Sequence, residues 1–270
     1  MIRRRTDGSF FLITQNAHAA LAAELAGHIG NAEFAALAPR DTVLSAVKLH
    51  DAGWPVHDDA PTINAAGLPT DVFEMPAAAA LSIWSRSTQL AAAAGGPYAG
   101  TLVSLHGLAL SLLIKPAATD TAATFALIKF QHRQIETQEE FRRELGLRTD
   151  QPLRHGLAEP GRSAEEDLLL FNFRLLQLCD QLSLNLCYEY VRLPVSEGIM
   201  PRPGEEPVTV LMSRDASGGV EVDPWPFDAA LIELSVPARR VPARIYRDDE
   251  ELRGEMAKAA DHQIQLRLRA

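Results

Sequence analysis

The stretch Ser163-Ala-Glu-Glu-Asp-Leu-Leu-Leu-Phe-Asn-Phe-Arg-Leu-Leu-Gln-Leu-Cys-Asp-Gln-Leu-Ser-Leu-Asn-Leu-Cys187 decides which fold the sequence predicts. Ser163 and Glu166 have the spacing of a capping box, which marks the start of a helix. Apolar residues then recur at helical spacing, with no glycine or proline to interrupt them. We therefore predict one long, largely buried helix that begins here and runs to about Val191.

Upstream of this helix, capping residues and helix breakers also have the spacing expected of helices. Thr14 and Asp41 are suitable N-caps, and Pro76 and Pro97 suit the first turn of a helix. Glycines and prolines mark the ends of the apolar segments between them. The predicted helices span residues 14–27, 42–51, 76–95, 97–116 and 121–145.

The composition changes after residue 193, where a linker-like segment is rich in proline and glycine. Short strand-like runs follow at 208–212, 219–222 and 231–236, and residues 264–268 alternate between apolar and polar. Residues 10–13 are a candidate for one more strand. The sequence therefore predicts a mainly α protein, with a helical core over residues 1–193. A small β-rich appendage over residues 194–270 is expected to pack on that core.

The composition restricts the classes of partner. The chain has 270 residues, with 26 Lys and Arg against 35 Asp and Glu, which gives a net charge of −9. This acidic balance argues against nucleic acid or an anionic membrane surface as the main partner. The longest apolar run, residues 101–114, is shorter than the roughly 20 residues that a membrane span needs. We expect a cytoplasmic protein that takes a small molecule, and a homo-oligomer remains open.

Asp180 is the ionisable residue whose position most needs an explanation. On a helical wheel it lies among Phe173, Leu176, Leu184 and Cys187, away from the polar stripe of its helix. A buried carboxylate without a partner costs several kcal/mol. Asp180 therefore needs a cation, a strong set of hydrogen-bond donors or a metal ion, and pairing with an arginine or the backbone is the simplest alternative.

Three histidines share this property. His18 and His106 lie on the apolar faces of their helices, and His50 extends the buried stripe of its helix with Asp51 beside it. Taken singly, each is explained as a core histidine or as a histidine at a helix end. Together, imidazoles and carboxylates from four helices favour one shared cation. The metal ligands predicted on this basis are His18, His50, Asp51 and Asp180, and the mixed nitrogen and oxygen set suits Fe, Mn, Co, Ni or Zn.

The order His18, His50-Asp51, Asp180 resembles the pattern of the HD-domain superfamily of metal-dependent phosphohydrolases. The wider sequence, including His50-Asp-Ala-Gly-Trp54 and Asp223-Pro-Trp-Pro-Phe227, also resembles an uncharacterised bacterial family described only as a domain of unknown function. The first resemblance implies an HD-domain-like helical bundle and a single divalent transition metal. The sequence departs from the HD-domain pattern at Trp54, where many HD enzymes have a basic residue.

The resemblance also implies the chemistry, which is hydrolysis of a small phosphate ester or nucleotide by metal-activated water. Asp51 would bind the metal and orient the water, and His106 would act as an acid or contact the phosphate. Two alternatives stay open. One is a di-iron oxygenase, which needs further histidine ligands, and the other is a non-catalytic module that binds a metal or a ligand.

Overall fold

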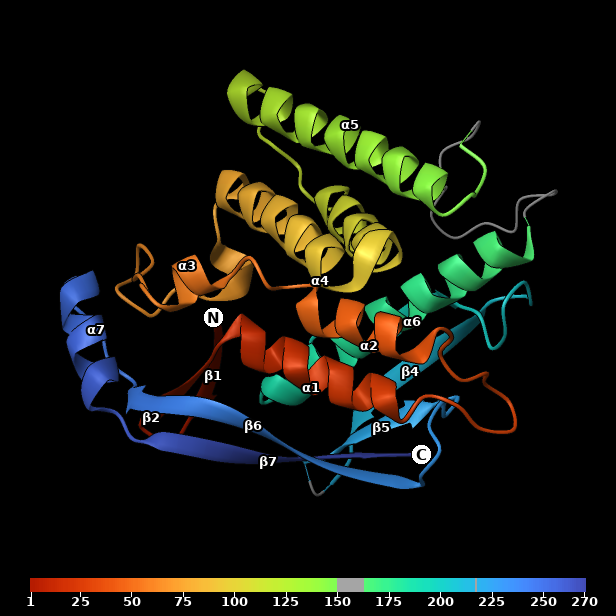
Figure 1. Cartoon of the computed structure of the whole chain (residues 1–270). Helices are drawn as coiled ribbons and strands as arrows, with labels where there is room; N and C mark the ends of the chain where they lie inside the picture. The colour runs from red at the N-terminus through yellow and green to blue at the C-terminus, as the bar shows by residue number, and fades with distance from the viewer. Residues whose placement is uncertain (150–162, 217) are drawn as a thin grey trace.

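The computed structural model describes residues 1–149, 163–216 and 218–270, and Figure 1 shows how the elements are arranged. More of its residues lie in helices than in strands, and the chain also forms a 3-10 turn, η1 (Val72–Glu74). The α-helices are α1 (Gln15–Gly27), α2 (Arg40–Leu49), α3 (Pro55–Asp58), α4 (Ala77–Ser111), α5 (Thr121–Glu144), α6 (Ala164–Cys187) and α7 (Asp249–Lys258).

The strands form a single sheet. They are β1 (Ile2–Thr6), β2 (Ser9–Ile13), β3 (Val195–Ile199), β4 (Val208–Arg214), β5 (Val220–Asp223), β6 (Leu231–Pro242) and β7 (Asp261–Arg269). The order across the sheet is β1-β2-β6-β7-β5-β4-β3. Only β5 and β7 pair in parallel; the other neighbours are antiparallel. The first and last strands of the chain therefore belong to one sheet.

The molecule is layered. Helices α1 and α6 lie against the sheet, α2 and α4 pack on them, and α5 covers α4 on the outside (Figure 1). One apolar core joins the inner face of the sheet to the helices, including Val210, Val236 and Leu268 from strands and Phe171 and Leu178 from α6. The innermost helices α1 and α6 are thus held between the sheet and α2 and α4.

The predicted fold class is wrong. The protein is about 48% helical and 20% strand, and its seven strands form a curled mixed sheet, which is not a small appendage on a mainly α bundle. Strand β6 runs to Pro242, well beyond the predicted end at Val236, because Pro237 interrupts the sequence signal but not the ladder with β7. The candidate strand at residues 10–13 is confirmed as part of β2, which pairs with β6.

The helical predictions upstream are confirmed in outline. The segments predicted as two helices, 76–95 and 97–116, form α4, which is broken at Gly96 where φ is +72°. A residue with a side chain rarely adopts this φ, so glycine allows the break. The capping box of α6 is present, since Ser163 Oγ accepts from Glu166 N and the Glu166 carboxylate accepts from Ser163 N. Across the described residues, no helix has both the length and the apolar character to cross a membrane.

Candidate metal centre

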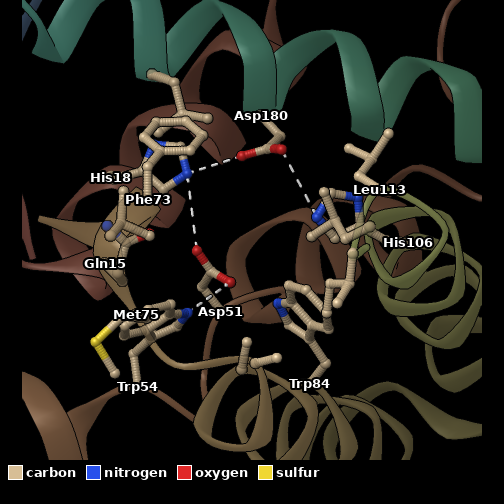
Figure 2. A pocket seen from close by; sticks show the side chains of 16 residues that line it. Gln15, His18, Asp51, Trp54, Phe73, Met75, Trp84, His106, Leu113 and Asp180 are labelled. Carbon is tan, nitrogen blue, oxygen red and sulfur yellow. Dashed lines mark hydrogen bonds and ion pairs between the residues drawn. The ribbon is translucent and has the colours of Figure 1, made fainter. Parts of the chain in front are cut away.

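Four elements deliver the candidate residues to one place. His18 comes from α1, His50 caps the end of α2 with Asp51 directly after it, His106 comes from the second half of α4, and Asp180 comes from α6. These helices contact each other in the core. All three histidines are at most 2% exposed. The structure therefore brings all five predicted site residues together, and Figure 2 shows four of them, His18, Asp51, His106 and Asp180.

The carboxylate of Asp180 lies at the middle of the group. Its Oδ1 is 2.9 Å from His18 Nε2 and 3.3 Å from His50 Nε2, and its Oδ2 is 3.6 Å from His106 Nε2. Ligand atoms of His18, His50 and Asp180 all lie within 4.8 Å of one another, so this group could hold a metal ion. Asp51 is the next residue outward, with Oδ2 3.8 Å from His18 Nε2 and 3.5 Å from His50 Nε2.

The contacts of His50 assign its tautomer. Its Nδ1 lies 2.6 Å from the carbonyl oxygen of Val47, which can only accept, so Nδ1 carries the hydrogen. In the neutral ring Nε2 then has a lone pair and no hydrogen. This atom is buried, has no hydrogen-bond partner and faces the carboxylates of Asp51 and Asp180. A lone pair that faces carboxylate oxygens needs a proton or a metal ion between them.

His18 leads to the same conclusion. Ser183 Oγ donates to the carbonyl oxygen of Asp180 at 2.8 Å, so the hydroxyl oxygen accepts from His18 Nδ1, also at 2.8 Å. The single N–H of a neutral His18 is thereby used. A proton or a metal ion must therefore lie between His18 Nε2 and Asp180 Oδ1, which are 2.9 Å apart. Such outer hydrogen bonds to Nδ1 are typical of metal-binding histidines.

The electrostatics also call for positive charge. Burial alone would lower the pKa of His50, but the carboxylates of Asp51 and Asp180 outweigh burial and raise the pKa to about 9. Burial likewise opposes ionisation of Asp180, yet its contacts with His18 and His50 hold the pKa of this carboxyl well below its usual range. The unpaired Nε2 of His50 and the chemistry of the donor set both fit a divalent transition metal.

Asp51 is oriented by its neighbour Trp54. The indole Nε1 donates to Asp51 Oδ1 at 3.1 Å, which leaves Oδ2 facing the two imidazoles. Burial raises the pKa of the Asp51 carboxyl, although the nearby His50 and His18 oppose this effect. Trp54 therefore occupies the position of the expected basic residue and acts on the site through Asp51.

His106 lies on the other side of Asp180 from His18 (Figure 2). Burial lowers the pKa of His106 to about 4, so its imidazole is neutral near pH 7. Its Nδ1 is buried and has no hydrogen-bond partner in the described structure. His106 is therefore available to a ligand rather than committed to the protein.

A pocket of about 370 Å³ opens onto these residues. His18, Asp51, His106 and Asp180 line it together with Gln15, and its other lining side chains are apolar. The described residues that line it include no lysine and no arginine. The metal group thus lies at the bottom of an apolar pocket.

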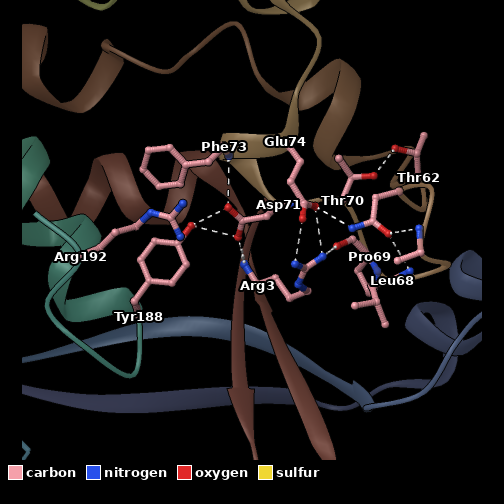
Figure 3. A network of polar contacts seen from close by, with 12 residues as sticks. Arg3, Thr62, Leu68, Pro69, Thr70, Asp71, Phe73, Glu74, Tyr188 and Arg192 are labelled. Carbon is pink, nitrogen blue, oxygen red and sulfur yellow. Dashed lines mark hydrogen bonds and ion pairs between the residues drawn. The ribbon is translucent and has the colours of Figure 1, made fainter. Parts of the chain in front are cut away.

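The loop after Trp54 supplies Val72, Phe73 and Met75 to the lining of the pocket. Asp71 holds the far end of this loop (Figure 3): its carboxylate accepts from Tyr188 Oη at 2.8 and 2.9 Å and from the backbone N–H of Arg3 at 2.9 Å. Asp71 also caps η1 through Phe73 N. The guanidinium of Arg192 lies 4.0 Å from the centre of the Phe73 ring. These contacts fix Phe73 where it lines the pocket.

The hydrogen bond between Ser183 Oγ and His18 Nδ1 is expected to raise metal affinity. Replacing Ser183 with alanine removes the partner of His18 Nδ1, and loss of such an outer contact lowers metal affinity by about 10- to 100-fold. Titration of the metal-free chain measures this effect. Ser111→Ala is the matched control, because Ser111 is also a buried helical serine but bonds Leu108 and Gln131. Equal affinity of the Ser183 variant and the wild type would contradict the assigned role.

The sequence assigns no role at the site to three residues that contribute to it, Ser183, Gln15 and Trp54. Ser183 follows Asp180 by three residues and Gln15 precedes His18 by three, so helical spacing alone could have placed both beside the ligands. Trp54 was noted only as a departure from a pattern. Its hydrogen bond to Asp51 depends on the turn after α2, which has no signal in the sequence.

No curated protein and no solved structure matches the chain. The family model described as "Protein of unknown function (DUF3891)" matches residues 1–243, which include every candidate site residue. This match confirms the expected uncharacterised family and does not extend to the HD-domain superfamily. The chain belongs to the DUF3891 family.

Proposed function

We propose that this protein is a metal-dependent hydrolase of small phosphate esters. The observation that carries the proposal is the buried Nε2 of His50, which has no hydrogen-bond partner and faces the carboxylates of Asp51 and Asp180. His18, His50 and Asp180 would hold a divalent ion. When bound, such an ion lowers the pKa of water and polarises a phosphoryl oxygen.

The remaining polar residues have separate tasks. Asp51, held by Trp54, orients a water molecule with Oδ2 and takes its proton. The oxygen of that water forms a bond to phosphorus as the ester P–O bond breaks. The ring N–H of His106 donates a hydrogen bond to the leaving oxygen. That oxygen takes up a proton from solvent as the product departs. The apolar rim excludes other water from the site.

The motif order supports this proposal. His18, His50-Asp51 and Asp180 follow the order that HD-domain phosphohydrolases use for their metal residues, and we infer a distant relation to that superfamily from it. The seven-stranded sheet departs from a helical bundle, so the fold does not support this relation. The residues and their geometry support it.

Turnover with defined metals tests the proposal. The metal-free full chain is loaded in turn with Mn, Fe, Co, Ni or Zn and assayed for phosphate release from a panel of esters. We expect release with at least one metal, and a loss of more than about 100-fold in Asp51→Asn with the fold retained. His28→Ala is the control, since His28 pairs with Asp228 at the surface. No release with any metal would overturn hydrolysis and leave a binding module.

One observation favours a second candidate. His106 Nε2 lies 3.6 Å from Asp180 Oδ2, on the side away from His18, so it adds an imidazole of the kind that a second ion needs. Two irons per chain and metal-dependent consumption of dioxygen would assign oxygen chemistry instead. One ion per chain and no consumption of dioxygen would remove this candidate.

A further inference from the structure

The walls of the pocket are apolar, whereas the residues at its floor are polar. Eleven of its 16 lining residues are apolar, and Trp54, Phe73, Met75, Trp84 and Leu113 surround the opening in Figure 2. A volume of about 370 Å³ lies near the lower end of the range for ligand pockets. Burial of an apolar group against aromatic rings is favourable, whereas a sugar or a charged group would lose its hydration there.

The charge of the lining also limits the ligand. Among the residues that the structure describes, no lysine or arginine lines the pocket. The two carboxylates of Asp51 and Asp180 balance a divalent ion, so the lining holds no further cation for a multiply charged ligand. A triphosphate in this pocket would leave charge unpaired at low polarity, which is costly.

The side-chain amide of Gln15 supplies the hydrogen-bond donor that a lysine or an arginine would otherwise supply to a ligand. Its side chain lines the pocket and is 1% exposed, and its Nε2 has no hydrogen-bond partner. The first turn of α1 is fixed, because Asp58 Oδ2 accepts from the backbone N–H of Gln15 at 2.6 Å. An unpaired buried donor is unfavourable, and an oxygen of a ligand in the pocket would satisfy it.

We propose that the pocket takes phosphate esters that carry one negative charge and an apolar organic group, and that Gln15 donates to a non-bridging oxygen of the phosphate. This assignment rests on the proposed function and specifies its substrate class. The apolar group lies against Trp54, Trp84 and Phe73, while the phosphate lies at the metal residues. Nucleotides are excluded by their charge and by the polarity of the sugar.

Binding can be tested without turnover. Trp54 and Trp84 line the pocket, so tryptophan fluorescence of the metal-loaded full chain reports occupancy. The probes are methylphenylphosphinate, which carries one negative charge and has no ester P–O bond to hydrolyse, together with adenosine monophosphate and adenosine triphosphate. We expect methylphenylphosphinate to bind at least about tenfold more tightly than either nucleotide. Equal or tighter binding of a nucleotide would overturn the substrate class.

Two variants test Gln15. In Gln15→Leu, which removes the donor at similar volume, we expect about tenfold weaker binding of methylphenylphosphinate, with melting temperature and metal content unchanged. Gln15→Glu places a negative charge in the same space and should abolish binding. Gln263→Leu, on the exposed side of β7, is the control. Wild-type affinity in either Gln15 variant would overturn its role.

The outcomes separate this inference from the proposed function. Selective binding without turnover of any ester would retain the ligand class and reject hydrolysis. Metal-dependent turnover that is equally fast for singly charged aryl phosphate diesters and for nucleotides would retain hydrolysis and reject the ligand class.

Discussion

Replacing Asp180 with alanine is expected to remove metal binding and to lower metal-dependent turnover by more than about 100-fold. Asp180 is the residue that the three histidines share, since its oxygens lie 2.9 Å from His18, 3.3 Å from His50 and 3.6 Å from His106. Loss of an outer contact already costs about 10- to 100-fold in affinity or activity, and loss of a ligand should exceed that.

The measurement is the metal content per chain after loading and desalting, together with turnover. Asp180→Asn keeps the shape but removes the charge, and it should lose metal as well. Asp228→Ala is the control, because Asp228 pairs with a histidine, His28, at the surface. Full metal content in Asp180→Ala would show that the ion, if bound, uses other residues.

Replacing Gly53 with alanine is expected to destabilise the fold and to displace Asp51. A Cβ at Gly53 would lie 2.3 Å from the carbonyl oxygen of Ile83 and 3.1 Å from Arg86 Cβ, so backbone would have to move. Gly53 N also donates to Ser87 Oγ, which ties the turn after His50-Asp51 to α4. Overpacking of this kind costs about 1–3 kcal/mol.

Denaturant unfolding and metal titration measure the two effects of the Gly53 change. Gly254→Ala is the control: a Cβ there meets nothing within 4 Å, and alanine within α7 should stabilise by about 0.5–1 kcal/mol. We expect Gly53→Ala to lower both the free energy of unfolding and the metal affinity. An unchanged free energy of unfolding would mean that α4 and this turn are packed less tightly than the distances require.

The helices were predictable because their signals are local. Caps such as Thr14 and Ser163, and breaks such as Gly96, act within a few residues of the structure that they determine. The sheet was not predictable, because its pairing joins distant parts of the chain: Ser9 pairs with Pro242, and Val220 pairs with Leu268. A pattern of period two indicates a strand but carries no information on its partner.

The candidate site follows the same division. The sequence placed His18, His106 and Asp180 on apolar faces, where helical periodicity is informative, and the structure has each of them buried or nearly so at one place. The character of the pocket could not be derived in this way. Phe73 and Met75 come from a loop held by Asp71, and Trp84 comes from α4, so the apolar walls depend on tertiary packing.

An anomalous-scattering experiment on crystals of the metal-loaded full chain tests the central claim most directly. The account predicts one peak bonded to His18 Nε2, His50 Nε2 and a carboxylate oxygen of Asp180, at about 2.0–2.2 Å from each. Crystals that contain the metal but show no peak among these three residues, or show it on other side chains, would contradict the account.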